Sequence, residues 1–533
     1  MKNIRSIGFL LILTMSSCVD LTENMITDTV ADVQFSTPEG LDEALIGAYQ
    51  PLRWFYGREP GMLMNLYGTD LFQEGQSYNS WWDNYGPGLN ASTRLEPSGD
   101  VLVWEHFYRG INYANTVISR SENIAIDASL KNAKVAEARF LRAHYYFVLV
   151  QHFGAVHLTL EETKEVELEA YRTPEEEIYK AIVEDLEFGI ANLPVQQIQY
   201  GRPTKYAAVN HLAKVYLTMK NWDKAAELAM EVINEGPYQL LDNYADVFDP
   251  FNQRHSEVIW SVQWGDNPEV NNPGNELQRF FSPRQWLLPG LVGDDTFHVG
   301  IARFWPTDYA LTTLYGNDYR TMELNTKNDS RYHATFKEVW EYNDAANIPA
   351  GRAIGDTAAW FTNDPLMQEL SDADAALLPY RLVRIKDRND VFSPTVQKHR
   401  YPILRNNGRD YMYMRLGETY LIAAEALMMQ GKLSEAAGYF NTLRSRAAYP
   451  GIEIPLITPE QLDIDEILDE RGRELAGELH RWPDLKRTGK LLERVRKYNP
   501  KAASNIREHH QLRPIPQTQI DRTKNEFGQN PGY

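Results

Sequence analysis

The residues best suited to hold a ligand lie in one short stretch, 77–86, with the sequence SYNSWWDNYG. Its four aromatic rings stand among Asn, Ser, Asp and Gly, with neither the two-residue alternation of a strand nor the period of an amphipathic helix. Such a stretch is typical of a surface loop. Indole and phenol rings combine a rigid apolar face with a polar tip, so they can cover the apolar face of a ligand while neighbouring polar side chains bond its rim.

Three sets of side chains are candidates for ligand contact. In the first, we expect a platform of aromatic rings with polar side chains beside it, formed by Trp81, Trp82, Tyr85, Asn79, Asp83 and Asn84. Adjacent residues often point opposite ways, so one of the two tryptophans is expected to be exposed, and the alternative is that one anchors the loop. The second set lies further along the chain and comprises Trp264, Trp286, Arg303, Trp305 and Tyr309. The third is Trp54 and Tyr56 in RWFYGRE. For the last two sets, the alternative is that the rings only pack loops together.

The first residues indicate export and anchoring. A basic start and a short apolar run, 7–15, lead through two serines to Cys18, the single cysteine of the chain. Because a bilayer span needs about 20 apolar residues, this run predicts a signal peptide over 1–17. A cysteine directly after the cleavage point is typical of a bacterial lipoprotein, although Met15 stands where leucine is commonest. We expect lipid on Cys18, a tether over 18–39 and an anchored mature protein; an incidental cysteine after an ordinary signal peptide is the alternative.

The bulk composition limits the class of partner. The chain has 533 residues, of which 43% are hydrophobic, and this is long enough for two or three units with their own cores. Its formal net charge is −19. An acidic surface repels phosphate backbones, so we expect no nucleic-acid partner.

The spacing of apolar residues predicts a mainly helical chain with one large interruption. Residues 40–240 repeat apolar side chains at three- and four-residue steps. Within them, 203–238 predicts two helices whose small alanines allow close approach, and 415–447 predicts a similar pair. Both resemble a tetratricopeptide repeat. Between them, 241–405 is a loop-rich insertion in which EVIWSVQW favours a strand, and 406–533 forms the C-terminal region.

One charged segment, ERGRELAGELHRWPDLKR, contains the acid, base and histidine residues of an active site but favours a structural role. Glu470 with Arg473, and Glu474 with Arg471, have the spacing of ion pairs along a helix. Trp482 is predicted to fill the core.

Several of these segments together resemble the RagB/SusD family of surface lipoproteins of Bacteroidota. The similar segments are WEHFYRGINYANTVI and AEARFLRAHYYFVLVQHFG near the N-terminus, and RLGETYLIAAEAL, RGRELAGELHRWPDLKRTG and RPIPQTQIDRTKNEFGQNPGY near the C-terminus. His157 departs from the family, which usually has proline there. The resemblance covers nearly the whole mature chain.

The resemblance implies a fold and a function. The fold is a helical solenoid of four tetratricopeptide-like helix pairs with a loop-rich inserted region. The resemblance also implies a protein that is not an enzyme. It is held on the outer face of the outer membrane through lipid on Cys18, and it covers a SusC-like TonB-dependent transporter that takes up captured oligosaccharides or polysaccharide. The candidate rings would then stack on sugar faces, for polysaccharide utilisation.

Other functions are left open by the sequence. The same family includes members that serve peptide uptake, and a helical-repeat scaffold could bind a protein partner. A glycosidase needs only two well-placed carboxylates, which spacing alone does not exclude. No cofactor is expected, and no metal, since the adjacent histidines His509 and His510 lack the spacing of a helical metal pair. A structural calcium ion has no motif here and stays an open alternative.

Overall fold

The structure is a computed structural model that describes residues 34–75, 81–93, 103–265, 267, 269, 271, 274–293, 300–315, 329–362, 364–388, 391–402 and 407–533. Cys18 and Asn79 therefore lie outside the described residues. Within the ranges above, no helix is both long enough and apolar enough to cross a membrane.

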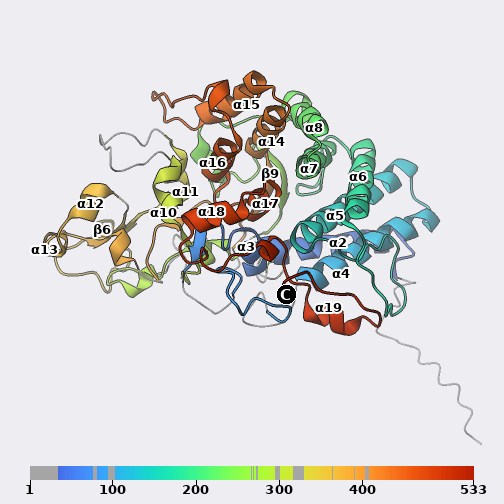
Figure 1. The fold of residues 1–533 in the computed structure, drawn as a ribbon, viewed down its shortest axis with the longest axis horizontal. Coiled ribbons are helices and arrows are strands. Elements are labelled where there is room, and N and C mark those ends of the chain that lie inside the picture. The colour runs from blue at the N-terminus through green and yellow to red at the C-terminus, as the bar shows by residue number, and fades with distance from the viewer. Residues whose placement is uncertain are drawn as a thin grey trace, which may run out of the picture.

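Long helices form a continuous stack, in which each packs against the next along the chain. The stack begins with α2 (Pro38–Tyr56), α4 (Val103–Arg120), α5 (Ala128–Phe153), α6 (Glu175–Asn192), α7 (Lys205–Thr218) and α8 (Trp222–Glu235). It continues from α8 to α14 (Leu416–Met429) and then α15 (Leu433–Arg446), although the whole insertion separates them in sequence (Figure 1). The predicted class, a mainly α-helical fold of tetratricopeptide-like pairs, is confirmed.

Local signals in the sequence set the ends of these helices. Asp127 caps α5 by accepting the Ser129 backbone N–H at 2.9 Å, and the helix ends at Gly154, whose φ of 71° suits glycine. At the joint between the two predicted helix pairs, alanines without exposed surface allow the four helices to approach closely. These alanines are Ala213, Ala225, Ala229, Ala423, Ala424 and Ala436.

Short strands occur mainly in the insertion and join it to the rest of the chain. Antiparallel pairs are formed by β1 (Phe72–Glu74) with β3 (Phe304–Pro306), β2 (Val258–Val262) with β9 (Tyr411–Arg415), and β4 (Phe336–Lys337) with β8 (Thr395–Val396). In a fourth, three-stranded sheet, β6 (Thr357–Phe361) lies between antiparallel β5 (Val339–Glu341) and parallel β7 (Arg381–Val383). The strand predicted from EVIWSVQW is therefore confirmed as β2.

Short helices complete the described chain. They are α3 (Glu59–Asn65), α9 (Leu277–Phe281), α10 (Asp308–Leu311), α11 (Arg331–Thr335), α12 (Pro365–Glu369), α13 (Asp372–Ala376), α16 (Ile464–Leu475), α17 (Arg481–Arg487), α18 (Leu491–Tyr498) and α19 (Gln517–Arg522). In Figure 1, α12 and α13 lie at the opposite end of the molecule from α4, α5 and α6. The C-terminus lies near α19 and α4.

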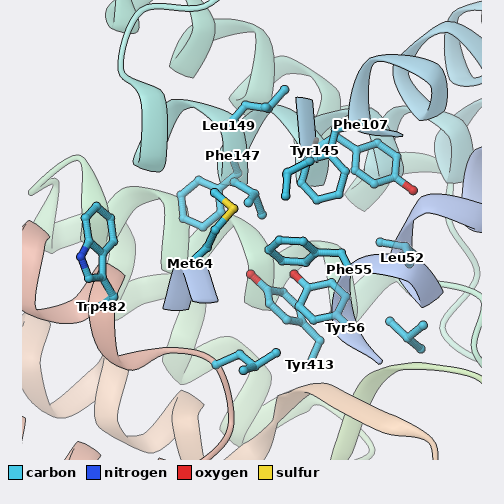
Figure 2. Packing of buried hydrophobic residues seen from close by; sticks show 14 of the residues in the cluster. Leu52, Phe55, Tyr56, Met64, Phe107, Tyr145, Phe147, Leu149, Tyr413 and Trp482 are labelled. Atoms are coloured by element: carbon cyan, nitrogen blue, oxygen red, sulfur yellow. The ribbon is translucent and has the colours of Figure 1, made fainter. Parts of the chain in front are cut away.

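The main hydrophobic core joins the first helices to the C-terminal region. Phe55 packs edge-on against Phe107, with ring centroids 5.0 Å apart. The ring of Tyr56 stacks on Tyr411 at 5.0 Å, and its hydroxyl is 2.9 Å from Nε2 of His144. Figure 2 shows Phe55, Tyr56 and Phe107 together in this core.

The charged segment that contains Trp482, residues 470–487, is structural, as predicted, but only one of its two predicted ion pairs forms. Arg473 donates to Glu470 at 2.7 Å. Glu474 instead accepts from Arg331 at 3.1 Å and from Arg415 at 2.5 Å. Its carboxylate therefore ties the insertion to the C-terminal region, a long-range pairing that helical spacing does not indicate.

Candidate functional site

Two of the candidate loops leave one antiparallel ribbon, formed by β1 and β3. Glu74 pairs with Phe304, and the Gly75 N–H donates to the Arg303 carbonyl at 3.1 Å. The chain leaves β1 toward the aromatic stretch, and it approaches β3 from the segment that carries Trp286. The two loops are therefore connected to neighbouring strands of one ribbon.

Trp81 is half-buried, and its ring lies on a base of two glycines. The residue has a φ of 59°, a left-handed conformation that is rare for a bulky side chain. A Cβ atom at Gly86 would lie 2.2 Å from Cε3 of the indole, and one at Gly88 would lie 2.2 Å from Nε1. Only glycine at both positions leaves room for the ring as it stands.

Trp82 and Tyr85 are buried, with exposed fractions of 3% and 2%. The guanidinium carbon of Arg513 lies 5.2 Å from the Trp82 ring centroid and 4.5 Å from that of Trp482. The Tyr85 hydroxyl donates to the Gly68 carbonyl at 3.0 Å, and burial raises the pKa of Tyr85. The structure corrects the expectation that these two rings face a ligand, because they anchor the loop to the core around Arg513.

Asn84 stays half-buried beside Trp81 and organises the loop. Its Oδ1 accepts the Gly86 N–H at 2.9 Å, and its Nδ2 is 3.4 Å from Oε2 of Glu74. Its backbone carbonyl accepts from Nδ2 of Asn505 at 3.0 Å. The asparagine thus links the loop both to β1 and to the C-terminal region.

Asp83 and Arg303 belong to a buried charged cluster and are not at the surface. Arg303 pairs with Glu59, and its guanidinium carbon lies 5.7 Å from the ring centroid of Tyr67. Burial alone would lower the pKa of Arg303, but Tyr67 and the two acidic groups raise it above its ordinary value. The structure corrects the ligand-binding expectation for both residues, because their charges are enclosed by protein.

Three aromatic candidates from the insertion are also buried: Trp264, Trp305 and Tyr309. The Trp264 backbone N–H donates to Oδ1 of Asp410 at 2.8 Å. Tyr309 stacks on Tyr498, with ring centroids 3.8 Å apart. Trp305 lies within β3. These rings pack the protein interior, so the structure corrects their expected role and supports the alternative of loop packing.

Trp286 is the exposed member of this set, with 39% of its surface accessible. It lies in a single 3-10 turn, Gln285–Leu287, and its indole N–H donates to the Gly300 carbonyl at 3.4 Å. Leu287, next to it, and Val292, six residues further along the chain, are exposed as well. Asn343 fixes this loop through two bonds of 2.9 Å to the backbone of Val292. Trp286 therefore has an accessible ring on a tethered loop.

The third set divides in the same way. Tyr56 is buried in the core, and burial raises its pKa well above the ordinary value, which corrects its expected role. Trp54 is half-buried and stacks on His106 at 3.9 Å between ring centroids, so His106 covers one face of the indole.

The sequence alone does not identify Gly86, Gly88 and Asn505, the residues that support the loop of Trp81. The closely spaced Gly86-Pro87-Gly88 after Tyr85 is a signal for a tight loop, but nothing in it indicates the Trp81 ring as its neighbour. Asn505 is more than 400 residues away in sequence and carries no signal. Among the described residues, no three His, Cys, Asp or Glu side chains gather as metal ligands do.

Comparison with known families gives two matches, which are separated by residues 218–255. Residues 256–533 match the SusD family, and residues 21–217 match a family described as "Starch-binding associating with outer membrane". Among curated relatives, "SusD-like protein P2" of Formosa agariphila is 29% identical over 561 residues and spans all of both chains. A "SusD-like protein" of Bacteroides ovatus is 31% identical over 469 residues, which cover 83% of this chain and 75% of the relative.

Solved structures share the fold at lower identity. A "Laminarin binding SusD-like protein" superposes with a TM-score of 0.67 at 24% identity, over 93% of this chain and all of its own. "Surface glycan-binding protein A" from Bacteroides thetaiotaomicron in complex with laminarihexaose gives a TM-score of 0.69 at 21% identity, over 93% and 99% of the two chains.

Proposed function

Because this chain belongs to the SusD family, we propose that it is a non-catalytic protein of the cell surface that captures glycan chains. The observation that carries the proposal is the accessible ring of Trp286, held by the Gly300 carbonyl and a tethered loop. A rigid exposed indole suits the apolar face of a sugar ring. Trp81 on its glycine base and Asn84 beside it are the second contact region.

Two further parts of the proposal concern location and partner. The protein is anchored in the outer membrane by lipid on Cys18, faces the exterior and passes glycan to a SusC-like TonB-dependent transporter. The family description that names the outer membrane supports the location. Mass spectrometry of the mature N-terminus tests lipidation, with Cys18→Ala as the unlipidated control. Co-purification of a TonB-dependent barrel from detergent-solubilised membranes tests the partner.

The direct test is binding of the protein that starts at Val19 to laminarin, starch, other neutral polysaccharides and a peptide pool, by calorimetry and affinity electrophoresis. We expect saturable binding to at least one glycan, weakened in Trp286→Ala and Trp81→Ala. Binding to peptides alone would contradict glycan capture and favour peptide uptake. Release of reducing sugar from a bound polysaccharide would contradict a non-catalytic role.

A further inference from the structure

A groove lies beside α2, where the loop between α6 and α7 crosses the end of β2. Its first hollow has a volume of about 460 Å³ and is lined by Tyr49, Gln50, Arg202 and Gln263 among others. A second hollow of about 250 Å³ lies next to it. The two share Tyr200, Gly201, Arg202 and Ser261, so they form one groove that passes Tyr200. We call this the Tyr200 groove.

Tyr200 presents a fixed and accessible ring between the two hollows. The residue is 36% exposed, and the guanidinium carbon of Arg254 lies 4.9 Å from its ring centroid. Its hydroxyl donates to the Gln253 carbonyl at 3.4 Å. Burial of the hydroxyl raises the pKa of Tyr200 to about 12, so the phenol is neutral at neutral pH. Because the guanidinium of Arg254 lies over the ring, a sugar would stack on the part of this rigid ring that stays accessible.

Amide groups and the guanidinium groups of Arg53, Arg202 and Arg254 lie around the groove, and Arg202 is paired with a carboxylate. Arg202 donates to Glu137 at 2.8 Å and to Gln199 at 2.6 Å. The side chain of Gln263 lies over Gly201, where a Cβ atom would be 2.3 Å from its Cγ. Glutamine amides both donate and accept hydrogen bonds, as hydroxyl groups of a neutral ligand require.

From the accessible ring, the amides and the paired hollows, we propose that the Tyr200 groove binds a stretch of neutral glycan chain, with one sugar ring against Tyr200 and its neighbours in the two hollows. This inference rests on the proposed function and adds a binding site distinct from Trp81 and Trp286. A single sugar would use one hollow, whereas a chain uses both. The first hollow lies within the usual volume range of ligand pockets.

A peptide added to the edge of β2 is less well supported. The Trp260 indole N–H donates to the Gly201 carbonyl at 2.9 Å, so the loop is fixed against β2. Strand addition relies mainly on backbone hydrogen bonds along a free edge, whereas the Tyr200 ring and the Gln263 amide offer side-chain contacts.

Tyr200→Ala tests the inference, and Ile198→Ala is the matched control. Ile198 is fully exposed on the same loop and lines neither hollow. Affinity electrophoresis in laminarin and in starch measures glycan binding by the wild-type protein and by both single variants. It is repeated on the Trp81→Ala/Trp286→Ala double variant, with and without the added Tyr200→Ala change. Unchanged thermal unfolding of each variant establishes that it is folded.

We expect Tyr200→Ala to weaken polysaccharide binding several-fold, because two sites on one chain bind a polymer more tightly than one. Ile198→Ala should bind as the wild type does. The Trp81→Ala/Trp286→Ala protein should retain weak binding that Tyr200→Ala removes, and ligand should protect the backbone of residues 195–204 from hydrogen exchange.

The contrary outcomes separate the inference from the proposed function. If Tyr200→Ala binds glycan as the wild type does and glycan does not protect residues 195–204, the Tyr200 groove is not a glycan site. Glycan capture by the protein would still hold. A wild-type protein that binds no glycan overturns both. If a peptide pool protects this loop and no glycan does, the groove binds a peptide and the inference is wrong.

Discussion

Asp70 and Arg481, which are 411 residues apart in sequence, form a buried two-bonded ion pair. The Arg481 guanidinium donates to the two Asp70 oxygens at 2.8 and 2.6 Å, and Arg494 donates to the same carboxylate at 2.7 Å. Asp70 lies just before β1, from which the aromatic stretch departs. The C-terminal charged segment therefore holds the ribbon that supports the candidate loops.

Replacement of one partner in this pair should destabilise the protein strongly. Arg481→Met removes two charge-assisted hydrogen bonds to Asp70. The buried Asp70 carboxylate then keeps only its hydrogen bond from Arg494. We expect a loss of about 3 kcal/mol in the free energy of unfolding, near the lower end for breaking a buried pair. Calorimetric thermal unfolding at pH 7 measures it as a lowered Tm.

A surface pair provides the control for this measurement. Arg522 donates to Glu105 at 2.7 Å, but its side chain is 68% exposed. Arg522→Ala should change the free energy of unfolding by no more than about 1 kcal/mol. Equal losses in the two variants would contradict a special role for the buried pair.

Acid should destabilise the protein in two overlapping ranges. Burial lowers the pKa of His399 and of His480 from 6.5 to about 4. The unfolded chain therefore binds these protons first, and stability falls as the pH drops from about 6.5 to about 4. Burial alone would raise the pKa of Glu470, but Arg331 and Arg473 lower it from 4.5 to about 2. Its stabilising contribution is present above pH 4.5 and is lost as the pH falls toward 2.

Thermal unfolding followed from pH 8 to pH 3 checks both ranges. A Tm that begins to fall near pH 6.5 and continues to fall below pH 4.5 is expected. A constant Tm between pH 7 and pH 4.5 would show that the buried histidines bind protons in the folded state as readily as in the unfolded chain.

Much of the fold follows from local sequence signals. The two alanine-rich helix pairs and the strand β2 form where spacing and residue type predict them, and α5 ends at a glycine, a common helix stop. The stacking of α8 on α14 is consistent with the repeated alanine pattern, because each pair needs a neighbour to bury its apolar face.

The candidate site was less predictable, because exposure depends on distant partners. Trp81 and Trp82 are adjacent and chemically identical, yet Trp82 is buried over Arg513 while Trp81 lies on two glycines. Nothing near Trp82 in sequence indicates Arg513. In the same way, local spacing paired Glu474 with Arg471, whereas the fold brings Arg415 and Arg331 to its carboxylate. The sequence does not indicate Tyr200 as a ligand-binding residue, because it stands among glutamines with no aromatic neighbour.

The adjacent tryptophans should give opposite results when each is changed to alanine. Trp82→Ala empties a buried site and should cost about 3–5 kcal/mol of stability. Trp81→Ala should leave the Tm close to that of the wild type but weaken glycan binding up to about tenfold, since a stacked ring contributes about 1 kcal/mol beyond its buried area. Parallel calorimetric unfolding and glycan titration measure both effects. A normal Tm in Trp82→Ala would contradict its anchoring role.

A methyl group at Gly88 should act on the binding loop through Trp81. The Cβ atom of Gly88→Ala would lie 2.2 Å from the indole nitrogen, much closer than atoms pack, so the ring must move. We expect glycan affinity to fall by about as much as in Trp81→Ala, and the double variant to lose little more, because both changes act on the same ring. Affinity electrophoresis of the two single variants and the double variant measures this coupling.

Gly438→Ala is the matched control, because its added Cβ lies in open space within α15 and meets no atom within 4 Å. It should bind glycan as the wild type does and should gain up to about 1 kcal/mol of stability from the higher helix propensity of alanine. If the affinity losses of Gly88→Ala and Trp81→Ala simply added in the double variant, the glycine would act independently of the ring. The base that we assign to Trp81 would then be incorrect.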